Sequence, residues 1–286
     1  DPFWQGLIIL KPEACPTYDL KKSLVAVCVA NAPFTEISYQ IQGMGGTDIV
    51  PFYDICEAYR SRHPLGNGWF AKEFSSEMLD AMQGIIEMWY DDTSRAYYLQ
   101  MLAWRRIREE WSFANAPITT HDRFFITEVK KALNNSEVFV DIGAHSGSVL
   151  KQFIRATGSS FQEIHLYEPD PKNLLDLQHT LQALPTEVRR RISVNSKAVG
   201  CKNEIASFYS NIGYASQISE LGKHQVEVIK LDNQNLSPSI MKLHIEGHEL
   251  LALQGAIRTV KENRPILLIT IYHNSDALYK IPQWLR

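Results

Sequence analysis

The sequence is poor in cysteine and has no closely spaced cysteine pair. Cys15, Cys28, Cys56 and Cys201 are spread along 286 residues, and no C-x-x-C motif occurs. This spacing argues against a disulfide framework and a thiolate zinc site, and it is typical of free thiols in a reducing compartment. We therefore expect a cytoplasmic protein.

Long hydrophobic runs and an excess of positive charge are missing as well. The longest apolar runs, residues 6–10, 24–30 and 266–271, have the length of strands, short of the ~18 residues that a membrane helix needs. No secretory signal is recognisable. The formal net charge is −3, which gives no basic footprint for nucleic acid. We expect neither a membrane nor a nucleic-acid partner, and the composition specifies no oligomeric state.

The chain does contain a strand, a glycine turn and a helix in direct succession. Residues 138–140 are apolar and branched or aromatic, as in a buried strand, and Asp141 follows them. Gly143 and Gly147 then mark a turn, and a helical pattern begins at Val149. Together these segments predict the first unit of a nucleotide-binding α/β sheet.

A second acid makes this reading more specific. Residues 164–168 are typical of the next strand, which ends in Glu168 and is closed by Pro169. In such sheets an acid at this point hydrogen-bonds the ribose hydroxyls of an adenosine ligand.

The kind of adenosine ligand follows from the turn. The G-x-G-x-x-G spacing that cradles a dinucleotide pyrophosphate is absent, which disfavours a nicotinamide-dependent oxidoreductase. A carboxylate at Asp141 repels phosphate but suits a ligand that carries an ammonium and a sulfonium group. S-adenosylmethionine has both groups, so we expect a methyltransferase-type site.

A series of motifs resembles the FkbM family of methyltransferases over about residues 120–286. The motifs are Asp141-Ile-Gly-Ala-His-Ser-Gly147, Tyr167-Glu168-Pro169, Ala198-Val-Gly200, Leu231-Asp232, Lys242-Leu-His-Ile-Glu-Gly-His-Glu249, Gly255-Ala256, Arg264-Pro265 and Ile271-Tyr272-His273. The element around Glu246, Gly247 and Glu249 is the most specific of them.

The resemblance implies a Rossmann-like class I methyltransferase sheet, with S-adenosylmethionine as the methyl donor. The implied acceptor is a small molecule or glycan, methylated at a hydroxyl of a sugar or a secondary metabolite. The residues expected to contact the donor are Asp141, Gly143, Ala144, His145, Gly147, Glu168, Pro169 and Ala198, the last of which would admit a flat adenine ring.

A hydroxyl acceptor needs its proton removed, which calls for a general base or a metal. His244, Glu246 and His273 stand at the ends of predicted strands, where ligands bind in open α/β sheets. FkbM relatives commonly carry an acid at the position of His244, and a neutral imidazole there could accept a hydroxyl proton. Glu249 is a further candidate, although it could equally cap the following helix.

Metal binding is an alternative for the same region. His244, Glu246 and His248 would share one side of a strand that continued through them, with His273 nearby. Gly247 is expected to end that strand, so this geometry fails and we expect no metal site.

The chain is long enough for more than one domain. We predict a small Rossmann-like α/β lobe over residues 1–72, a helical bridge over 73–116 and the methyltransferase domain over 117–286. The overall fold class is α/β.

Periodic patterns predict individual elements of these domains. We expect a helix over residues 74–90, a strand over 240–245, a single helix over 249–260 and a strand over 266–271. The closing pair of strands expected of this fold is not recognisable after Pro282, so we expect C-terminal strands to be missing.

A second hypothesis comes from the histidine at position 244, where FkbM relatives commonly carry an acid. The domain could bind S-adenosylmethionine without catalysis and serve as an interaction module in a larger assembly. Methyl transfer to any acceptor would exclude that hypothesis.

Overall fold

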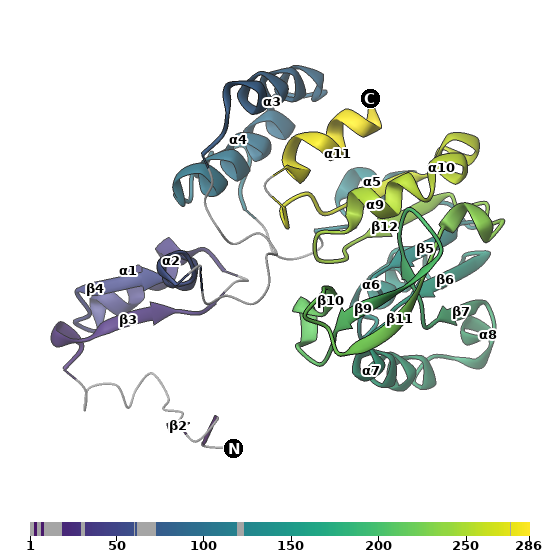
Figure 1. Ribbon diagram of the computed structural model, residues 1–286, viewed down its shortest axis with the longest axis horizontal. Coiled ribbons are helices and arrows are strands. Elements are labelled where there is room, and N and C mark those ends of the chain that lie inside the picture. Colours follow the sequence, from purple (N-terminus) through teal and green to yellow (C-terminus); the bar gives the residue numbers. More distant parts are fainter. Residues whose placement is uncertain are drawn as a thin grey trace. The chain divides into compact units, whose positions relative to one another are not determined.

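The computed structural model describes residues 19–29, 32–59, 61, 73–118, 123–274 and 276–286, together with the backbone of 3–4 and 7–8. The chain divides into two compact units (Figure 1). The first comprises Asp1–His63, Trp69–Phe74 and Trp89–Thr120, and the second comprises Pro64–Gly68, Ser75–Met88 and His121–Arg286. The two helices predicted to form one bridge thus belong to different units.

The first unit is built around a parallel β-α-β arrangement. Its parallel strands β3 and β4 pair in register from Leu24 with Asp48 to Val27 with Pro51. The elements of this unit are β1 (Phe3–Trp4), β2 (Leu7–Ile8), η2 (Leu20–Lys22), β3 (Leu24–Val27), α1 (Phe34–Gly43), β4 (Asp48–Pro51), α2 (Phe52–Ala58) and α4 (Asp92–Ile107). Residues 24–51 thus form a two-stranded parallel β-α-β arrangement.

Helix α4 is tied to the rest of the first unit at its carboxyl end. The carboxylate of Glu110 accepts hydrogen bonds from the backbone N–H groups of Phe34 and Thr35 at 2.9 and 3.2 Å. These are the first N–H groups of α1, which have no partner within their own helix. Arg108 adds an ion pair to Asp54 of α2 at 2.5 Å.

The second unit has a five-stranded parallel sheet at its centre (Figure 1). The strand order is β13-β12-β5-β6-β7. Their bounds are β5 (Val138–Ile142), β6 (Glu163–Tyr167), β7 (Ile192–Asn195), β12 (Ile240–Leu243) and β13 (Ile266–Ile269). The predicted Rossmann-like α/β class is confirmed.

Alternate side chains of each strand enter two different cores. Phe139, Leu166 and Ile240 pack into one, with residues of α6 and α7. Val140 and Met241 pack into the other, with residues of α9, α10 and α11. The sheet is therefore covered on both faces, as parallel sheets require. The helices of this unit are α3 (Ser76–Met88), α5 (Thr127–Ala132), α6 (Ser148–Ala156), α7 (Pro171–Gln182), α8 (Thr186–Arg189), α9 (Glu249–Gln254), α10 (Ile257–Asn263) and α11 (Ala277–Leu285).

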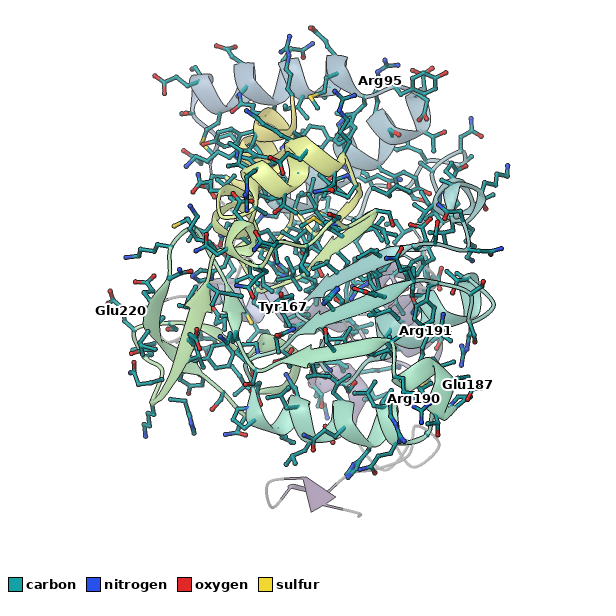
Figure 2. The ribbon with its side chains drawn as sticks, turned by 90° about the vertical axis from the view of Figure 1, so that its right-hand side faces the viewer. Arg95, Tyr167, Glu187, Arg190, Arg191 and Glu220 are labelled. Atoms are coloured by element: carbon teal, nitrogen blue, oxygen red, sulfur yellow. The ribbon has the colours of Figure 1, made fainter. Side chains whose placement is uncertain are left out.

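A smaller sheet lies beside the parallel one. Its strand order is β10-β9-β11-β8, in which β11 pairs parallel with β8 and antiparallel with β9. The bounds are β8 (Ala198–Val199), β9 (Glu204–Tyr209), β10 (Gln217–Ile218) and β11 (His224–Ile229), with the short turns η4 (Gly213–Ala215) and η5 (Leu231–Asn233). Tyr167, at the end of β6, lies between the two sheets (Figure 2) and packs against Val199 and Ile229.

The predicted single helix over 249–260 is wrong, because the chain forms two helices, α9 and α10. A Cβ at Gly255 would come within 1.9 Å of the Gly200 carbonyl oxygen, so the chain passes very close to a neighbouring loop there. The carboxylate of Asp232 then accepts from the N–H groups of Arg258 and Thr259 and starts α10 anew. The predicted strand over 240–245 also ends earlier, at Leu243.

Two compositional expectations can be compared with the structure. Cys28, Cys56 and Cys201 are free thiols, whereas Cys15 lies outside the described residues. Among the described residues, every helix is too short or too polar to cross a bilayer.

Candidate functional site

The carboxyl ends of the parallel strands open onto one cavity, where ligands bind in open α/β sheets. The cavity encloses about 780 Å³, part of which is open to solvent. Its lining includes these predicted site residues: Gly143, Ala144, His145, Glu168, Pro169, Ala198, His244 and Glu246. Six expected donor contacts and two expected acceptor contacts therefore share one space.

The glycine turn after β5 lies directly against the loop after β12. Gly143 has φ +83°, and a Cβ added to it would come within 2.1 Å of the His244 carbonyl oxygen. Only glycine combines this backbone conformation with such a close approach. The Gly143 N–H donates to the Tyr167 carbonyl at 2.9 Å. The turn is thus held between the ends of β6 and β12.

Glu168 connects this turn to the next helix. Its Oε2 accepts from the His145 N–H at 2.8 Å, and its Oε1 accepts from the Asp170 N–H at 2.9 Å and Asn173 Nδ2 at 3.3 Å. Burial raises the pKa of Glu168, and these hydrogen bonds oppose the rise. A carboxylate has about four acceptor positions, so one position is left for a ligand hydroxyl from the cavity.

Asp141 lies behind the cavity rather than in its lining. Its side chain is fully buried, and Lys242 Nζ lies 2.9 Å from its Oδ1. Among the described residues this ammonium is the only polar partner of the carboxylate. Burial raises the pKa of Asp141, and the Lys242 charge opposes the rise without reversing it. Lys242 also donates to the Gly143 carbonyl at 2.6 Å. The ion pair of Asp141 and Lys242 is therefore hydrogen-bonded to the backbone of the glycine turn.

Gly147 is also outside the cavity lining and has a packing role. It has φ +85°, and a Cβ there would lie 2.9 Å from Leu177 Cδ1 and 3.0 Å from Thr180 Cγ2 of α7. The second glycine of the motif therefore allows α6 to begin close to α7.

The loop over 211–216 is fastened to the same region by Asp170. The Asp170 Oδ1 accepts from the N–H groups of Lys172 and Asn173 at the start of α7. Its Oδ2 accepts from the Asn211 N–H at 2.9 Å and the Ser216 hydroxyl at 2.7 Å. Burial raises the pKa of Asp170, but these hydrogen bonds outweigh it and lower the pKa overall.

Replacing Asp170 with alanine is expected to reduce the free energy of unfolding by about 1–2 kcal/mol, the usual cost of losing a helix cap. The pKa of Asp170 is lowered on folding, so its contribution is present above the unfolded aspartate pKa of about 3.9. The contribution is lost as the pH falls through the lower folded value. Urea unfolding of both proteins between pH 7 and pH 3 measures this difference.

Asp176, which is exposed on the same helix, provides the matched control. The Asp176→Ala protein should differ from the parent by no more than about 0.5 kcal/mol at any of these pH values. A difference between Asp170→Ala and the parent that stayed constant down to pH 3 would contradict this account of Asp170.

The three predicted acceptor residues come together at the other end of the cavity. Glu246 Oε1 lies 3.2 Å from His244 Nε2 and 3.3 Å from His273 Nε2. His273 is buried behind them, 3% exposed. Its Nδ1 lies 2.7 Å from Glu249 Oε1. The two histidines and Glu246 form what we call the acceptor cluster.

Charges within the acceptor cluster are strongly coupled. Burial lowers the pKa of His273, but Glu246 and Glu249 outweigh it and raise the pKa to about 9. Burial raises the pKa of Glu246, but hydrogen bonds from His244 and His273 lower it to about 2. Burial lowers the pKa of His244 despite Glu246. At neutral pH the cluster thus holds a carboxylate, a charged His273 and a neutral His244.

Glu249 and His248 have different positions. The Glu249 carboxylate is buried and accepts from the Ile245 N–H at 2.9 Å, the Gly247 N–H at 3.0 Å and the Thr270 hydroxyl at 3.0 Å. It organises the loop after β12 through N–H groups that precede α9, whereas the capping alternative expected it to cap the following helix. His248 lines the cavity but lies outside the acceptor cluster.

Sequence reasoning assigned no site role to several other residues that line the cavity. Lys242 and Arg123 bring positive charge, and Val199 and Phe208 bring apolar surface beside Ala198. A lysine within the apolar strand of β12 was a readable signal of a buried ion pair. No comparable signal marks Phe208, because it belongs to β9 of the smaller sheet, outside the strand-and-turn motifs that predicted the site.

Comparisons with known proteins agree with this arrangement. Residues 141–286, just over half of the chain, match the family model described as the methyltransferase FkbM domain. No curated protein matches the chain.

Solved structures of two methyltransferases are similar to the chain to different degrees. The methyltransferase FkbM from Methylobacillus flagellatus KT has a TM-score of 0.67 and 22% identity, covering 98% of this chain and 72% of that one. At this identity the likeness shows the fold alone. A precorrin-6y C5,15-methyltransferase from Geobacter metallireducens GS-15 has 17% identity, covering 63% of this chain and 76% of that one. Its TM-score of 0.36 is too low to indicate a shared fold. With the family model matching over half of its length, the chain belongs to the FkbM family of methyltransferases.

Proposed function

We propose that this protein is an S-adenosylmethionine-dependent O-methyltransferase that acts on a hydroxyl of a sugar, a glycan or a secondary metabolite. One observation supports this most directly: a single cavity is lined both by the glycine turn with Glu168 and by His244 with Glu246. Methyl transfer requires a donor site and a proton acceptor that face each other across one space.

The residues at the donor end fit an adenosine ligand. Glu168 offers an acceptor position for ribose hydroxyls, and Ala198, Val199 and Phe208 form an apolar wall suited to a flat ring. The bound donor would supply a methyl group that is already activated on its sulfonium.

The acceptor cluster receives the proton of the acceptor hydroxyl. The acceptor oxygen forms the new bond to the methyl carbon while the carbon–sulfur bond breaks, and the sulfur keeps the electron pair. The hydroxyl proton leaves to the acceptor cluster, in which His244 and Glu246 face the cavity. His273 lies behind Glu246 and orients its carboxylate.

Isothermal titration with S-adenosylmethionine and S-adenosylhomocysteine tests the donor assignment, followed by a screen of sugar and polyketide hydroxyls for methyl transfer. Micromolar binding and transfer to one of these acceptors would support the proposal. Donor binding without transfer to any acceptor would favour the non-catalytic interaction module. That hypothesis rests on His244, which stands where relatives commonly carry an acid. Absence of donor binding would reject both.

Replacing Glu168 with alanine is expected to weaken S-adenosylmethionine binding by more than about tenfold, or about 1.4 kcal/mol. The substitution removes an acceptor for the ribose and also releases the His145 N–H that fixes the turn. The dissociation constant from titration is the readout. Glu163→Ala is the control, because Glu163 begins the same strand and its side chain is 53% exposed. Equal affinity in Glu168→Ala and the parent would refute the donor role of Glu168.

A further inference from the structure

The acceptor cluster has the composition of a metal site. It presents two imidazoles and one carboxylate, and His244, Glu246 and His273 are the described residues whose donor atoms come close enough to hold one ion. Two of these side chains line the cavity. A set of two histidines and one carboxylate with open positions is a common arrangement for divalent transition metals.

Distances within the acceptor cluster suit a shared ion. Two ligand atoms bound at about 2.1 Å to the same ion are about 3.0–3.4 Å apart. Glu246 Oε1 is 3.2 Å from His244 Nε2 and 3.3 Å from His273 Nε2. All three donor atoms lie within 4.8 Å of one another. The His244 ring has the cavity beside it, which leaves room for it to adjust to an ion.

A second layer of contacts already orients one of the imidazoles. The Glu249 carboxylate lies 2.7 Å from His273 Nδ1 and is itself held by the N–H groups of Ile245 and Gly247. Metal-binding histidines commonly donate their other ring N–H to a carboxylate in this way. The contact leaves His273 Nε2 directed at Glu246, and an ion bound to this nitrogen displaces its proton.

The backbone also holds Glu246 in an unusual conformation. Glu246 has φ +56° and Gly247 has φ +108°, and non-glycine residues adopt the left-handed region uncommonly. Asn274 Nδ2 donates to the Gly247 carbonyl at 2.6 Å and so ties this loop to the segment that carries His273. This geometry turns the Glu246 carboxylate toward both histidines, although β12 has ended.

We propose that His244, Glu246 and His273 bind one divalent first-row transition-metal ion, with its remaining coordination positions open to the cavity. Two nitrogen ligands favour ions such as Co²⁺, Ni²⁺ or Zn²⁺ over Mg²⁺ and Ca²⁺, which prefer oxygen. Arg123 Nη2 lies 3.5 Å from His244 Nδ1. Its side chain is exposed, so it can move away when Nδ1 carries the proton.

The role of the ion rests on the proposed function, whereas its binding does not. An acceptor hydroxyl bound to the ion becomes more acidic and is held in a fixed direction. Because the three side chains are then bound to the ion, the hydroxyl proton passes to solvent water at the open part of the cavity while the methyl group is transferred to oxygen.

Titration of the full, chelator-stripped chain with CoCl₂ or ZnCl₂ alone tests the site. We expect one ion per chain and visible d–d absorption of the bound Co²⁺, whereas MgCl₂ should bind far more weakly. His244→Ala and Glu246→Gln should abolish saturable binding, and Glu249→Gln should weaken it about 10- to 100-fold. His179→Ala, an exposed histidine on α7, should bind as the parent does.

Two results would overturn the proposal. One is the absence of saturable Co²⁺ or Zn²⁺ binding by the parent, and the other is unchanged binding in the His244→Ala protein. Because His244 faces the cavity, its replacement is the variant least prone to unfold, and circular dichroism confirms its fold. Donor titration on the same samples separates the two proposals. Metal binding without donor binding would reject only the proposed function, and the reverse would reject only the metal site.

Discussion

Replacing Lys242 with methionine is expected to lower the free energy of unfolding by about 3–5 kcal/mol, the usual cost of removing one partner of a buried ion pair. Lys242 is 2% exposed and Asp141 is fully buried, so water cannot take the place of the lost ammonium. The same substitution removes the hydrogen bond to the Gly143 carbonyl. Urea unfolding followed by circular dichroism gives the change in free energy from the midpoint and slope.

The Asp141→Asn/Lys242→Met double variant separates charge from packing. It should recover most of the lost stability, because the interior then contains no unpaired charge. A deficit of about 1 kcal/mol from the Gly143 hydrogen bond should persist. Lys261→Met, at an exposed position of α10, should leave stability unchanged. Equal destabilisation of the single and double variants would show that the charge of Asp141 is not the cause.

The loss in Lys242→Met should also depend on pH. Burial already raises the pKa of Asp141, and removing the lysine raises it further. A raised aspartate pKa favours the folded state below the unfolded value of about 3.9. Stability then falls as the pH rises toward the folded pKa and levels off above it. The variant should therefore lie closest to the parent in the most acidic buffers in which both fold.

Replacing Phe153 with alanine is expected to lower the free energy of unfolding by about 3–5 kcal/mol, as for other buried aromatic side chains. Phe153 of α6 is completely buried, and its ring stacks on Phe139 of β5 at a centroid distance of 4.5 Å. Phe125 and Phe161 lie against it at 6.0 and 5.8 Å. The lost ring leaves a cavity between the helix and the strand that carry the glycine turn. The shift in the urea midpoint measures this cost.

Leu175→Ala provides the surface comparison for Phe153→Ala. Leu175 is 58% exposed, and its truncation should change stability by about 0.5 kcal/mol or less. If Phe153→Ala were as mild as Leu175→Ala, the aromatic cluster would not be the core that this packing indicates.

The parallel sheet could be predicted because its signals are local. The strand over 138–142 and the turn that follows it combine branched apolar residues with glycines at fixed places. The break between α9 and α10 could not be predicted in this way. It depends on the close approach of Gly255 to Gly200 and on the cap from Asp232, both of which are distant in sequence.

The two ends of the cavity differ in the same respect. Glu168 and the turn were predicted from two successive strands, and both line the cavity. The expectation that no metal site forms relied on Gly247 ending the strand, which breaks the alternation of residues 244, 246 and 248. The strand ends at Leu243. Glu246 then adopts a left-handed backbone conformation that brings its carboxylate to His244 and His273, and such a conformation follows no periodic sequence pattern. Backbone conformation of this kind leaves no trace in a hydropathy pattern.

The contact between Gly143 and the His244 carbonyl has a consequence for attempts to change which compound the cavity accepts. The two loops approach each other at the backbone, because a Cβ at Gly143 would come within 2.1 Å of the His244 carbonyl oxygen. Remodelling the loop after β12 for a bulkier compound would also shift the glycine turn after β5, and a misplacement of about 1 Å can cost about 100-fold in rate. Retuning is better directed at the 211–216 loop, which is fastened through the side chains of Asp170 and Ser216. That loop can be lengthened or exchanged while the backbone contact stays as it is.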